Sequence, residues 1–580
     1  MGTVHDIKKR FRGFLTTYMS LYKTFDIEIP KEKGIYFSER IKKAILNGEK
    51  IFIFGDYDAD GLCSVSYKIL MIRKAAEALG VKDVFIEYKI PTRAEHYGIK
   101  YEQFKGYLDI YDLVITSDNG THSNFYSKLT EEDHDKLIIV DHHPLIDPMN
   151  MTPKQEELLK EFSSRVNVVN PNVDGSVKIS TGILDEALFM IMREEIPELK
   201  KITESDEFSD LAAITLISDM ADKNNKVVRG VIKKGLGRIN KRDRAMYQYL
   251  FPEFNGVKTK EITAEDIGFQ IAPLLNSGPR MSSAVNAIPL LIMQEAFTEK
   301  NRRDRTYRSF IDGMDVLTFT NELRKETTDR FTKIADSMMT DFLQESPDAN
   351  IAVLKIKDSP IGINGLISSN ISQKYGIPVI VVSENIFGNV TSSGEMELLG
   401  SGRGEGVRQI LLFFKGINLE SKESINFGGH DMAVGVQIPN WEAFEKELVA
   451  FNEKPFEGLS LSTHKVFNEE AITLSEYKDV CDEYSAIVSG IEINDNIFVK
   501  IKAFIIGVNE YRNNFKNIIL QDASGEQLSI ITRPSANLDL LTMNEIEILV
   551  SITPGNENTR FADIMTIVES RPDMDLLLKP

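Results

Sequence analysis

Three aspartates at alternate positions stand out near the start of the sequence. The stretch IFIFGDYDADG, residues 51–61, places Asp56, Asp58 and Asp60 just after four apolar residues. Alternate side chains of an extended chain point to the same side, so the three carboxylates are expected to face together. Like charges this close raise one another's pKa unless a cation lies among them. The spacing therefore predicts a bound cation and the chemistry that a cation supports.

Acidic and imidazole side chains recur after later apolar segments. Asp118 follows DLVIT, the run Asp141, His142 and His143 follows KLIIV, and Asp219 ends a helical stretch in LISDMADKNN. Each segment alone is typical of a helix cap or a turn. Together, carboxylates and imidazoles suit Mn²⁺, Mg²⁺ or Zn²⁺, and several carboxylates can bridge two ions. The combination predicts a two-metal site able to stabilise charge on a phosphoryl group.

Short apolar runs alternate with helical patterns in this part of the chain, and the acidic residues lie where the runs end. Helical patterns cover 62–79 and 183–194, between and after the runs. This β-α alternation is typical of a largely parallel sheet, in which ligands bind beyond the carboxyl ends of the strands. The runs are KIFIFGDYDADG, VFIEYKIPTR, DLVITSDNG, KLIIVDHH and VNVVNPN.

The remaining pattern predicts several further regions in this chain of 580 residues. A long charged helix follows the first α/β region, then a second α/β region with the strand-like IPVIVVS, then a tail of short strands typical of a small β-barrel. The predicted boundaries are 1–50 for an N-terminal helical segment, 51–298 for the first α/β domain, 299–348 for the long connecting helix, 349–455 for the second α/β domain, and 456–580 for the β domain.

Composition excludes several classes of protein. The net charge of −19 argues against a protein that coats nucleic acid by bulk electrostatics, although an acidic metal site adds to that charge. Cys63 and Cys481 are the only cysteines, too few for a disulfide framework or a cysteine zinc site. No apolar stretch approaches the ~20 residues of a membrane helix, and the N-terminus lacks the apolar core of a signal peptide. We therefore predict a cytoplasmic protein without a membrane partner.

Several motifs of the sequence resemble a known superfamily. GDYDADG, SDNG, VDHHP and LISDMADKNN, in that order and spacing, resemble the four motifs of the DHH phosphoesterases. IPTRAEHYG, VVNPN, DLAAITLISDMADKNNKVVRGVIKKGLGRI and DIGFQIAPLLNSGPRM resemble the RecJ family of single-strand-specific 5′ exonucleases. GINGLISSNISQKYGIPVIVVS, GSGRG and FGGHDMAVG resemble the DHH-associated domain. The resemblance implies an α/β fold, with a parallel-sheet DHH domain and a DHH-associated α/β domain joined by the long helix, and an OB-like C-terminal β-barrel.

The resemblance also implies a set of metal ligands. Asp58 is expected to bind the first metal ion and Asp60 the second, and Asp118 is expected to bridge them. His142 and Asp219 complete the ligands of the second ion. The resemblance to the family implies two bound Mn²⁺ ions as the cofactor, with Mg²⁺ as the alternative.

Three further residues of the same motifs receive roles from the resemblance. His143 is expected to lie close to the scissile phosphate, and Asp141 to act on a histidine without binding the metal. Asp56 is either a ligand or a residue that orients one. The implied reaction is attack of a metal-activated hydroxide on phosphorus, in which the metal ions neutralise charge on the phosphoryl group and the leaving 3′ oxygen.

The residues expected to hold the substrate come from several motifs. Arginine presents a fork suited to phosphate oxygens, and glycine lets backbone approach phosphate closely. In place of the family's NAAGR this sequence has NSGPR, where Pro279 removes a backbone donor next to an arginine, and IPTRAEHYG also departs from the usual pattern. These departures bear on end preference and substrate length. The expected substrate-binding residues are Arg93, Asn276, Arg280, Ser368, Ser369, Arg403, Gly428, Gly429 and His430.

The predicted function is hydrolysis of single-stranded DNA from the 5′ end, with release of 5′-mononucleotides, in DNA repair, recombination or replication. Expected partners are single-stranded DNA and a helicase or single-strand-binding protein, and the expected state is a monomer. A DHH phosphodiesterase acting on short oligoribonucleotides or cyclic dinucleotides is the alternative, although such relatives are usually shorter. A non-catalytic replication scaffold of the Cdc45 type is disfavoured, because those scaffolds have lost metal ligands that this sequence keeps.

Overall fold

The structure is a computed structural model, and it divides the chain into two units. One unit comprises Lys23–Lys325, and the other combines Met1–Tyr22 with Glu326–Pro580. The residues that the structure describes are 4–21, 29–92, 99–121, 128–143, 157, 160–161, 164–171, 179–254, 257–258, 260–281, 287–293, 304–347, 349–385, 396–416, 425–430, 432–453, 465–468, 470–488, 497–510, 516–532, 545–552, 559–561 and 564–571.

A parallel sheet forms the centre of the Lys23–Lys325 unit. The described strands follow the order β2-β1-β3-β4-β5, and every pairing between them is parallel. The runs IFIF, LVITS and LIIV are buried along their whole length, as expected for strands covered on both faces. The predicted α/β fold with a parallel sheet is confirmed. The strands are β1 (Ile51–Phe54), β2 (Ile86–Lys89), β3 (Leu113–Ser117), β4 (Leu137–Val140) and β5 (Val168–Val169).

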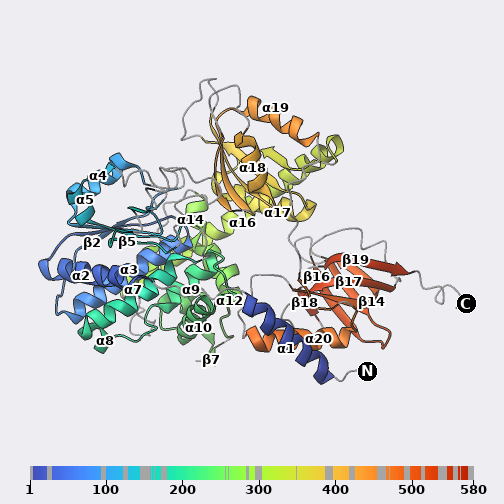
Figure 1. Ribbon diagram of the computed structural model, residues 1–580, viewed down its shortest axis with the longest axis horizontal. Coiled ribbons are helices and arrows are strands. Elements are labelled where there is room, and N and C mark those ends of the chain that lie inside the picture. Colours follow the sequence, from blue (N-terminus) through green and yellow to red (C-terminus); the bar gives the residue numbers. More distant parts are fainter. Residues whose placement is uncertain are drawn as a thin grey trace, which may run out of the picture. The chain divides into compact units, whose positions relative to one another are not determined.

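Helices cover both faces of this sheet. Figure 1 shows α4 (Tyr101–Ile110) and α5 (Glu131–Asp135) on one face, and α2 (Lys31–Asn47), α3 (Ala59–Ala78) and α7 (Thr181–Glu195) on the other. The predicted helical patterns at 62–79 and 183–194 correspond to α3 and α7. Further elements of this unit are α8 (Pro197–Ile202), α9 (Ser209–Ser218), α10 (Lys226–Lys241), α11 (Ala245–Leu250), the β6–β7 pair (Glu253–Phe254 and Val257–Lys258), α12 (Ala264–Asp266), the π-helix η3 (Ile267–Ile271), α13 (Ala272–Leu275), α14 (Ser277–Arg280) and α15 (Ile288–Leu291).

The predicted long helix is present within segment 299–348. Helix α16 spans Arg305–Glu345, a length of 41 residues. The boundary between the two units falls inside this helix, at Lys325 and Glu326. Its role as the connection between two domains stays a prediction.

The second unit contains a mixed α/β region after α16. Its described strands follow the order β11-β12-β10-β9-β8, in which only the β8–β9 pairing is parallel. The predicted strand IPVIVVS corresponds to β9. The elements are β8 (Ala352–Lys355), the 3-10 helix η5 (Ile361–Ile363), α17 (Asn364–Tyr375), β9 (Val379–Glu384), β10 (Leu398–Arg403), α18 (Val407–Gly416), β11 (Asn426–His430), β12 (Ala433–Ile438) and α19 (Trp441–Asn452).

A β-rich region ends the chain. Its described strands form an open sheet of order β18-β16-β15-β14-β17-β19, with β13 paired to β14, so closure into an OB-like barrel stays a prediction. The elements are β13 (Lys465–Val466), α20 (Leu474–Val488), β14 (Ile497–Glu510), β15 (Lys516–Gln521), β16 (Gln527–Thr532), β17 (Glu545–Ser551), β18 (Thr559–Phe561) and β19 (Ile564–Arg571).

The first helix of the chain packs into this C-terminal region. Phe11 and Leu15 of α1 (Val4–Leu21) share a core with Tyr477 of α20 and with the sheet. Arg12 Nε also lies 2.6 Å from Glu483 Oε1 of α20. The predicted N-terminal segment 1–50 is therefore divided, because α1 belongs to one unit and α2 to the other. The other domain boundaries stay predictions.

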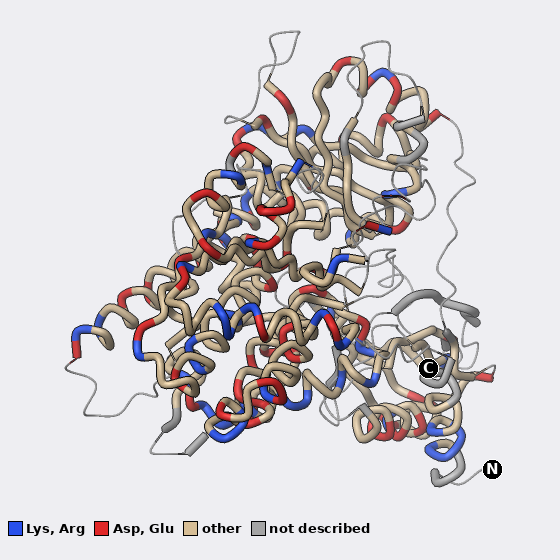
Figure 2. Tube along the Cα trace, turned by 60° about the vertical axis from the view of Figure 1, so that its left-hand side comes forward, with Lys and Arg blue, Asp and Glu red and all other residues tan. Residues whose placement is uncertain are grey.

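Charged residues are distributed along both units. Figure 2 shows acidic and basic positions interspersed along the helices, consistent with 87 acidic and 68 basic residues in the chain. Within the part of the chain that the structure describes, no helix is both long and apolar enough to cross a membrane.

Candidate metal centre

The turn between β1 and α3 carries the first three aspartates. Asp58 caps α3, and its Oδ1 accepts a hydrogen bond from the Gly61 backbone N–H at 3.1 Å. Gly61 permits this tight turn, because a Cβ at this position would lie 2.5 Å from the carbonyl oxygen of Asp56. Asp56 and Asp60 are buried and Asp58 is half-buried.

Asp118 follows β3 in a left-handed backbone conformation. Its φ is 61°, a region that aspartate and asparagine adopt more readily than other side chains with a Cβ. Its backbone N–H donates to the carbonyl oxygen of Val140 at the end of β4. The turn is thereby tied to the neighbouring strand, and the carboxylate of Asp118 is buried at the carboxyl edge of the sheet.

The two histidines after β4 approach these carboxylates. His142 Nε2 lies 3.1 Å from Asp118 Oδ1 and 3.4 Å from Asp60 Oδ2. It also lies 3.6 Å from Oδ2 of Asp219, the residue at the end of α9. His143 Nδ1 lies 3.7 Å from Asp118 Oδ1. Four segments that are far apart in the sequence thus meet here. They contribute Asp60, Asp118, the pair His142 and His143, and Asp219.

Three overlapping groups of side chains have ligand atoms within 4.8 Å of one another. Asp118 belongs to two of the groups, and His142 also belongs to two. Shared ligands are what a site for more than one ion requires. The second and third groups match the predicted ligands of the second and first metal ions, and the assignment to individual ions stays a prediction. The groups are Asp118–His142–His143, Asp60–His142–Asp219 and Asp56–Asp58–Asp118.

The electrostatics of the cluster fit a divalent cation. Burial and the charge of Asp118 raise the pKa of Asp60 well above its ordinary value. Burial and the charge of Asp58 do the same to the pKa of Asp118, and burial raises the pKa of Asp219 to about 6. Burial lowers the pKa of His142, which favours the neutral imidazole that coordinates metals. Bound cations would relieve the repulsion among these carboxylates, and oxygen and nitrogen donors suit Mn²⁺ or Mg²⁺.

The carboxylate of Asp141 contacts both histidines of the motif. Its Oδ1 lies 2.8 Å from His143 Nδ1 and accepts a hydrogen bond from the His142 backbone N–H at 2.8 Å. Its Oδ2 accepts from the backbone N–H of Thr121 at 2.8 Å. Burial alone would raise the pKa of Asp141, but the charge of His143 and the hydrogen bonds to the His143 ring and the Thr121 hydroxyl hold that pKa below its ordinary range. Asp141 therefore lies where the predicted role, orienting a histidine, requires it.

The same contact favours the cationic form of His143. Burial alone would lower the pKa of its imidazole, but the charge of Asp141 and the hydrogen bond between them outweigh burial and raise that pKa well above the ordinary value. A cationic imidazole at the edge of the cluster suits contact with a phosphate oxygen.

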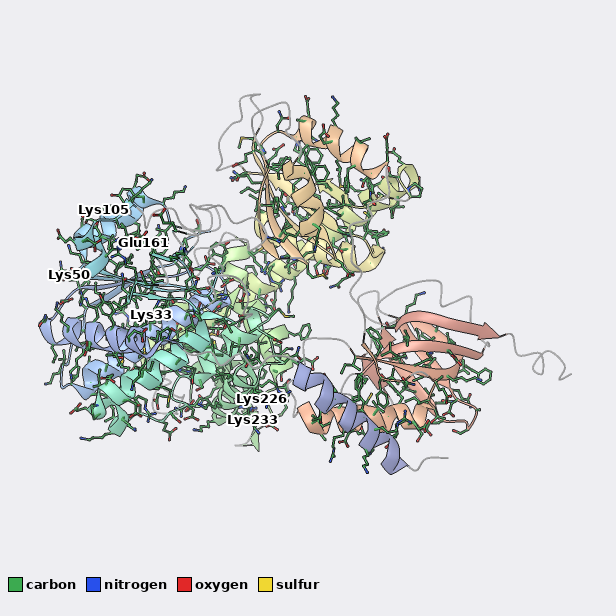
Figure 3. The ribbon with its side chains drawn as sticks, viewed as in Figure 1. Lys33, Lys50, Lys105, Glu161, Lys226 and Lys233 are labelled. Atoms are coloured by element: carbon green, nitrogen blue, oxygen red, sulfur yellow. The ribbon has the colours of Figure 1, made fainter. Side chains whose placement is uncertain are left out.

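The end of β5 supports this histidine motif. Asn170 Nδ2 donates to the carbonyl oxygen of His143 at 2.8 Å and to Thr121 Oγ1 at 3.0 Å. Within β5, the carbonyl oxygen of Val168 accepts a hydrogen bond of 2.8 Å from Nζ of the buried Lys33 of α2, a lysine labelled in Figure 3. Asn170 belongs to VVNPN, a motif that resembles the RecJ family. The sequence did not predict the hydrogen bonds that Asn170 makes.

The predicted substrate residues of this unit have different positions. Asn276 Oδ1 accepts a hydrogen bond from the backbone N–H of Ala59 at 3.0 Å, so it supports the turn that carries the aspartates. Arg280 is half-buried at the end of α14. Arg93 lies outside the described residues.

The predicted substrate residues of the second unit gather around β10. A Cβ at Gly365 of α17 would lie 2.8 Å from Arg403 Nη2, so the guanidinium packs against this helix. Ser368 is buried and its hydroxyl donates to the carbonyl oxygen of Gly365 at 3.2 Å. Ser369, in contrast, is half-buried. Helix α17 and Arg403 are therefore in contact, Ser368 uses its hydroxyl within its own helix, and a role of these residues in substrate binding stays a prediction.

The glycine motif lies two strands away from Arg403. Arg403 of β10 pairs with Ala433 of β12, and Ala433 pairs with His430 of β11, so the three share one row of the sheet. Gly428 and Gly429 are exposed, and Gly429 has a φ of 135° that favours glycine. The side chain of His430 lies outside the described residues.

Comparison with known proteins bears on this centre. Residues 50–204 match the family model described as "DHH family, N-terminal domain". The matched residues lie within the Lys23–Lys325 unit. This match includes seven of the eight predicted metal and histidine-motif residues discussed above and ends before Asp219.

Curated relatives bear the name single-stranded-DNA-specific exonuclease RecJ. The chain is 27% identical to the Bacillus subtilis protein over 439 residues, which are 75% of this chain and 49% of the relative. It is 27% identical to the Haemophilus influenzae protein, over 67% of this chain and 63% of the relative. The chain thus spans about half to two thirds of these relatives. A putative single-strand DNA-specific exonuclease of Bacillus phage SPbeta is 25% identical over 62% of this chain and 58% of its own length. The predicted resemblance to RecJ proteins is confirmed.

Solved structures show the same fold. The structure of RecJ from Thermus thermophilus in complex with Mn²⁺ matches with a TM-score of 0.63 and 19% identity, over 94% of this chain and 72% of that chain. A structure of exonuclease RecJ bound to manganese matches with a TM-score of 0.51 and 22% identity, over 74% of this chain and 94% of that chain.

Proposed function

We propose that this chain is a metal-dependent exonuclease that hydrolyses single-stranded DNA in the 5′ to 3′ direction and releases 5′-mononucleotides. The observation that carries the proposal is the convergence of five aspartates and two histidines, from β1, β3, β4 and α9, into overlapping ligand groups. The names of the curated relatives support the substrate.

The cluster would hold two divalent ions. Asp56, Asp58 and Asp118 would bind one, and Asp60, His142 and Asp219, together with Asp118, the other. Such ions activate water and neutralise charge on a phosphoryl group. The titles of the matched structures support Mn²⁺, with Mg²⁺ as the alternative.

The residues around the cluster would orient the substrate. Asp141 keeps His143 cationic and fixes its ring, so that the other ring nitrogen is available to donate a hydrogen bond to a phosphate oxygen. Asn276 holds the aspartate turn, and Arg280 would contact a phosphate together with Arg93. No protein nucleophile is required.

The second unit would bind the rest of the strand. Ser369, Arg403, Gly428, Gly429 and His430 would contact the backbone of the DNA. The C-terminal sheet would belong to an OB-like domain, a fold that binds single strands by stacking and charge. A role in DNA repair, recombination or replication, a helicase or single-strand-binding partner, a monomeric state and a cytoplasmic location stay predictions.

The test uses the full chain with Mn²⁺ and strands labelled at either end. Immediate release of a labelled mononucleotide from the 5′ end of single strands, with slower loss of 3′ label, is expected. Duplexes of equal length, dinucleotides and short oligoribonucleotides serve as competing substrates. Cleavage confined to dinucleotides or oligoribonucleotides would overturn the proposal in favour of the other DHH activity.

The matched control is Asp118→Asn. Asparagine tolerates the left-handed backbone at this position, with φ of 61°, and has nearly the shape of aspartate, so the variant removes a shared ligand with little backbone strain. Activity equal to that of the wild type would contradict the metal centre itself.

A further inference from the structure

We propose that Thr181 is a positioning residue that fixes the carboxylates of Asp60 and Asp118 relative to each other and so sets the affinity of the centre for divalent ions. This inference rests on the proposed function of the same centre. It concerns a residue outside the four motifs and on a different element, the first turn of α7.

Thr181 makes one hydrogen bond to each of two candidate ligands. Its backbone N–H donates to Asp60 Oδ2 at 3.1 Å, and its hydroxyl donates to Asp118 Oδ1 at 3.1 Å. Asp60 comes from the start of α3 and Asp118 from the turn after β3, so one residue joins two elements that carry the site. Thr181 and both carboxylates are buried, which removes competing water.

The contacted oxygen atoms are the ones nearest His142. His142 Nε2 lies 3.4 Å from the same Asp60 Oδ2 and 3.1 Å from the same Asp118 Oδ1. The hydroxyl of Thr181 and the imidazole of His142 therefore both contact Asp118 Oδ1 and restrain this carboxylate. Residues that orient metal ligands in this way contribute strongly to metal affinity.

Close packing of α7 on α9 holds Thr181 in place. A Cβ at Gly182 would lie 1.9 Å from Thr215 Oγ1 and 2.9 Å from Ala212 Cα, so only glycine allows this approach. Ser180 Oγ and Thr215 Oγ1 form a hydrogen bond of 2.9 Å beside it. Asp219, a third candidate ligand, caps the end of α9. The packing of α7 on α9 therefore positions both Thr181 and the helix that carries Asp219.

The first turn of α7 favours the charged form of the carboxylates. The free backbone N–H groups at a helix N-terminus carry partial positive charge, and α7 has 15 residues. The Thr181 N–H is one of these groups and points at Asp60. The hydroxyl extends the same favourable interaction to Asp118, which the backbone N–H does not contact.

Two substitutions separate the hydroxyl from the rest of the residue. Thr181→Val keeps the shape and the backbone N–H but removes the hydrogen bond to Asp118. Thr181→Ser keeps the hydroxyl and removes only the methyl group. Circular dichroism and thermal unfolding without metal establish that each variant is folded.

The measurement is Mn²⁺ binding to the full chain without DNA. Electron paramagnetic resonance quantifies the free ion. Thr181→Val is expected to bind Mn²⁺ about 10- to 100-fold more weakly than the wild type, the usual cost of losing a residue that orients a ligand. Thr181→Ser is expected to bind close to the wild-type affinity. In cleavage assays Thr181→Val should need more Mn²⁺ for half-maximal rate and recover much of the rate when Mn²⁺ is saturating.

The outcomes separate this inference from the proposed function. If Thr181→Val binds Mn²⁺ as the wild type does, while Asp118→Asn does not, the inference falls and the metal centre stands. If Thr181→Ser binds as weakly as Thr181→Val, the hydroxyl is not the cause and the inference falls as well. If the wild type itself binds no Mn²⁺, both the inference and the proposed function are overturned.

Discussion

Two buried groups of charges in the Lys23–Lys325 unit are organised in opposite ways. In the candidate metal centre, carboxylates face carboxylates, and the pKa values of Asp60 and Asp118 are raised. Beneath it, between α3 and α7, Lys68 Nζ lies 2.5 Å from Asp185 Oδ1, and both side chains are fully buried. The metal centre concentrates charge of one sign, and we call it the uncompensated group. The second set of residues pairs opposite charges, and we call it the compensated group.

A second ion pair extends the compensated group. Arg244, at the start of α11, contacts both carboxylate oxygens of Asp210 in α9, with Nη2 3.1 Å from Oδ1, and Tyr247 donates to the same carboxylate at 2.8 Å. Burial alone would lower the pKa of Arg244, but the charge of Asp210 and its hydrogen bonds to the guanidinium together raise that pKa above its ordinary value. Every partner needed for neutrality is supplied by the chain itself.

The difference shows how one α/β unit organises buried charge for two purposes. Buried ions are tolerated in a protein interior when they are paired, and the pairs specify how helices dock. Buried like charges destabilise the protein and persist where a ligand compensates them. The two groups are neighbours, because Lys68 Nζ donates at 2.8 Å to Oγ of Ser117, the residue before Asp118.

The largest expected effect comes from the uncompensated group. Asp118→Asn should lower the cleavage rate on the order of 10⁴-fold, or ~5.5 kcal/mol of activation free energy, because both ion sites lose a ligand. The thermal unfolding temperature without metal should stay equal or rise, since a repelling charge is removed. Rates come from release of 5′ label, and a large fall in thermal stability of the variant would contradict the comparison.

The next effect comes from the compensated group. Lys68→Met should lower the free energy of unfolding of this unit by about 3–5 kcal/mol, because it leaves Asp185 buried without its cation. Chemical denaturation measures the loss. The double variant Lys68→Met/Asp185→Leu is the control and should recover much of the stability, whereas an equally unstable double variant would show that the pair matters for another reason.

The smallest effect concerns Asp219 and changes sign with metal. Its pKa of about 6 lies above that of an unfolded aspartate, so the folded protein loses stability as the pH rises from about 4 through 6. At pH 8 without metal, Asp219→Asn should stabilise the protein by about 1 kcal/mol, a modest gain because the side chain is 35% exposed and screened by water.

Mn²⁺ should reverse this order of stability. With saturating Mn²⁺ the wild type gains binding free energy that the variant, lacking a ligand, gains only in part. Thermal unfolding of both proteins, with and without Mn²⁺, tests this reversal. If the Asp219→Asn variant stays more stable than the wild type in Mn²⁺, that result would argue against Asp219 as a ligand.

Local pattern predicted the uncompensated group well. The apolar runs before Asp58, Asp118 and His142 predicted strands, and parallel strands end at the same edge, so the meeting of these side chains followed from the sequence. Asp219 was a candidate because it ends a helical stretch, the family resemblance gave it the role of a ligand, and the structure brings it to His142.

The compensated group was not predicted, for a physical reason. Lys68 and Asp185 are 117 residues apart, and each stands in a helical pattern where a charged residue normally faces water. Thr181 was missed because its partners Asp60 and Asp118 lie 121 and 63 residues away in the sequence, although Ser180 before an apolar helix signals a helix start. The packing of α1 against α20 depends likewise on contacts between the two ends of the chain.

The central claim is that the clustered carboxylates and imidazoles hold divalent ions. The direct test is a titration of the full chain and of Asp118→Asn with Mn²⁺, in which bound and free ion are counted without DNA. The account predicts two bound ions for each wild-type chain, and fewer or much weaker ions for Asp118→Asn, which loses the ligand shared by two of the groups. Equal stoichiometry and affinity in the two proteins would contradict it.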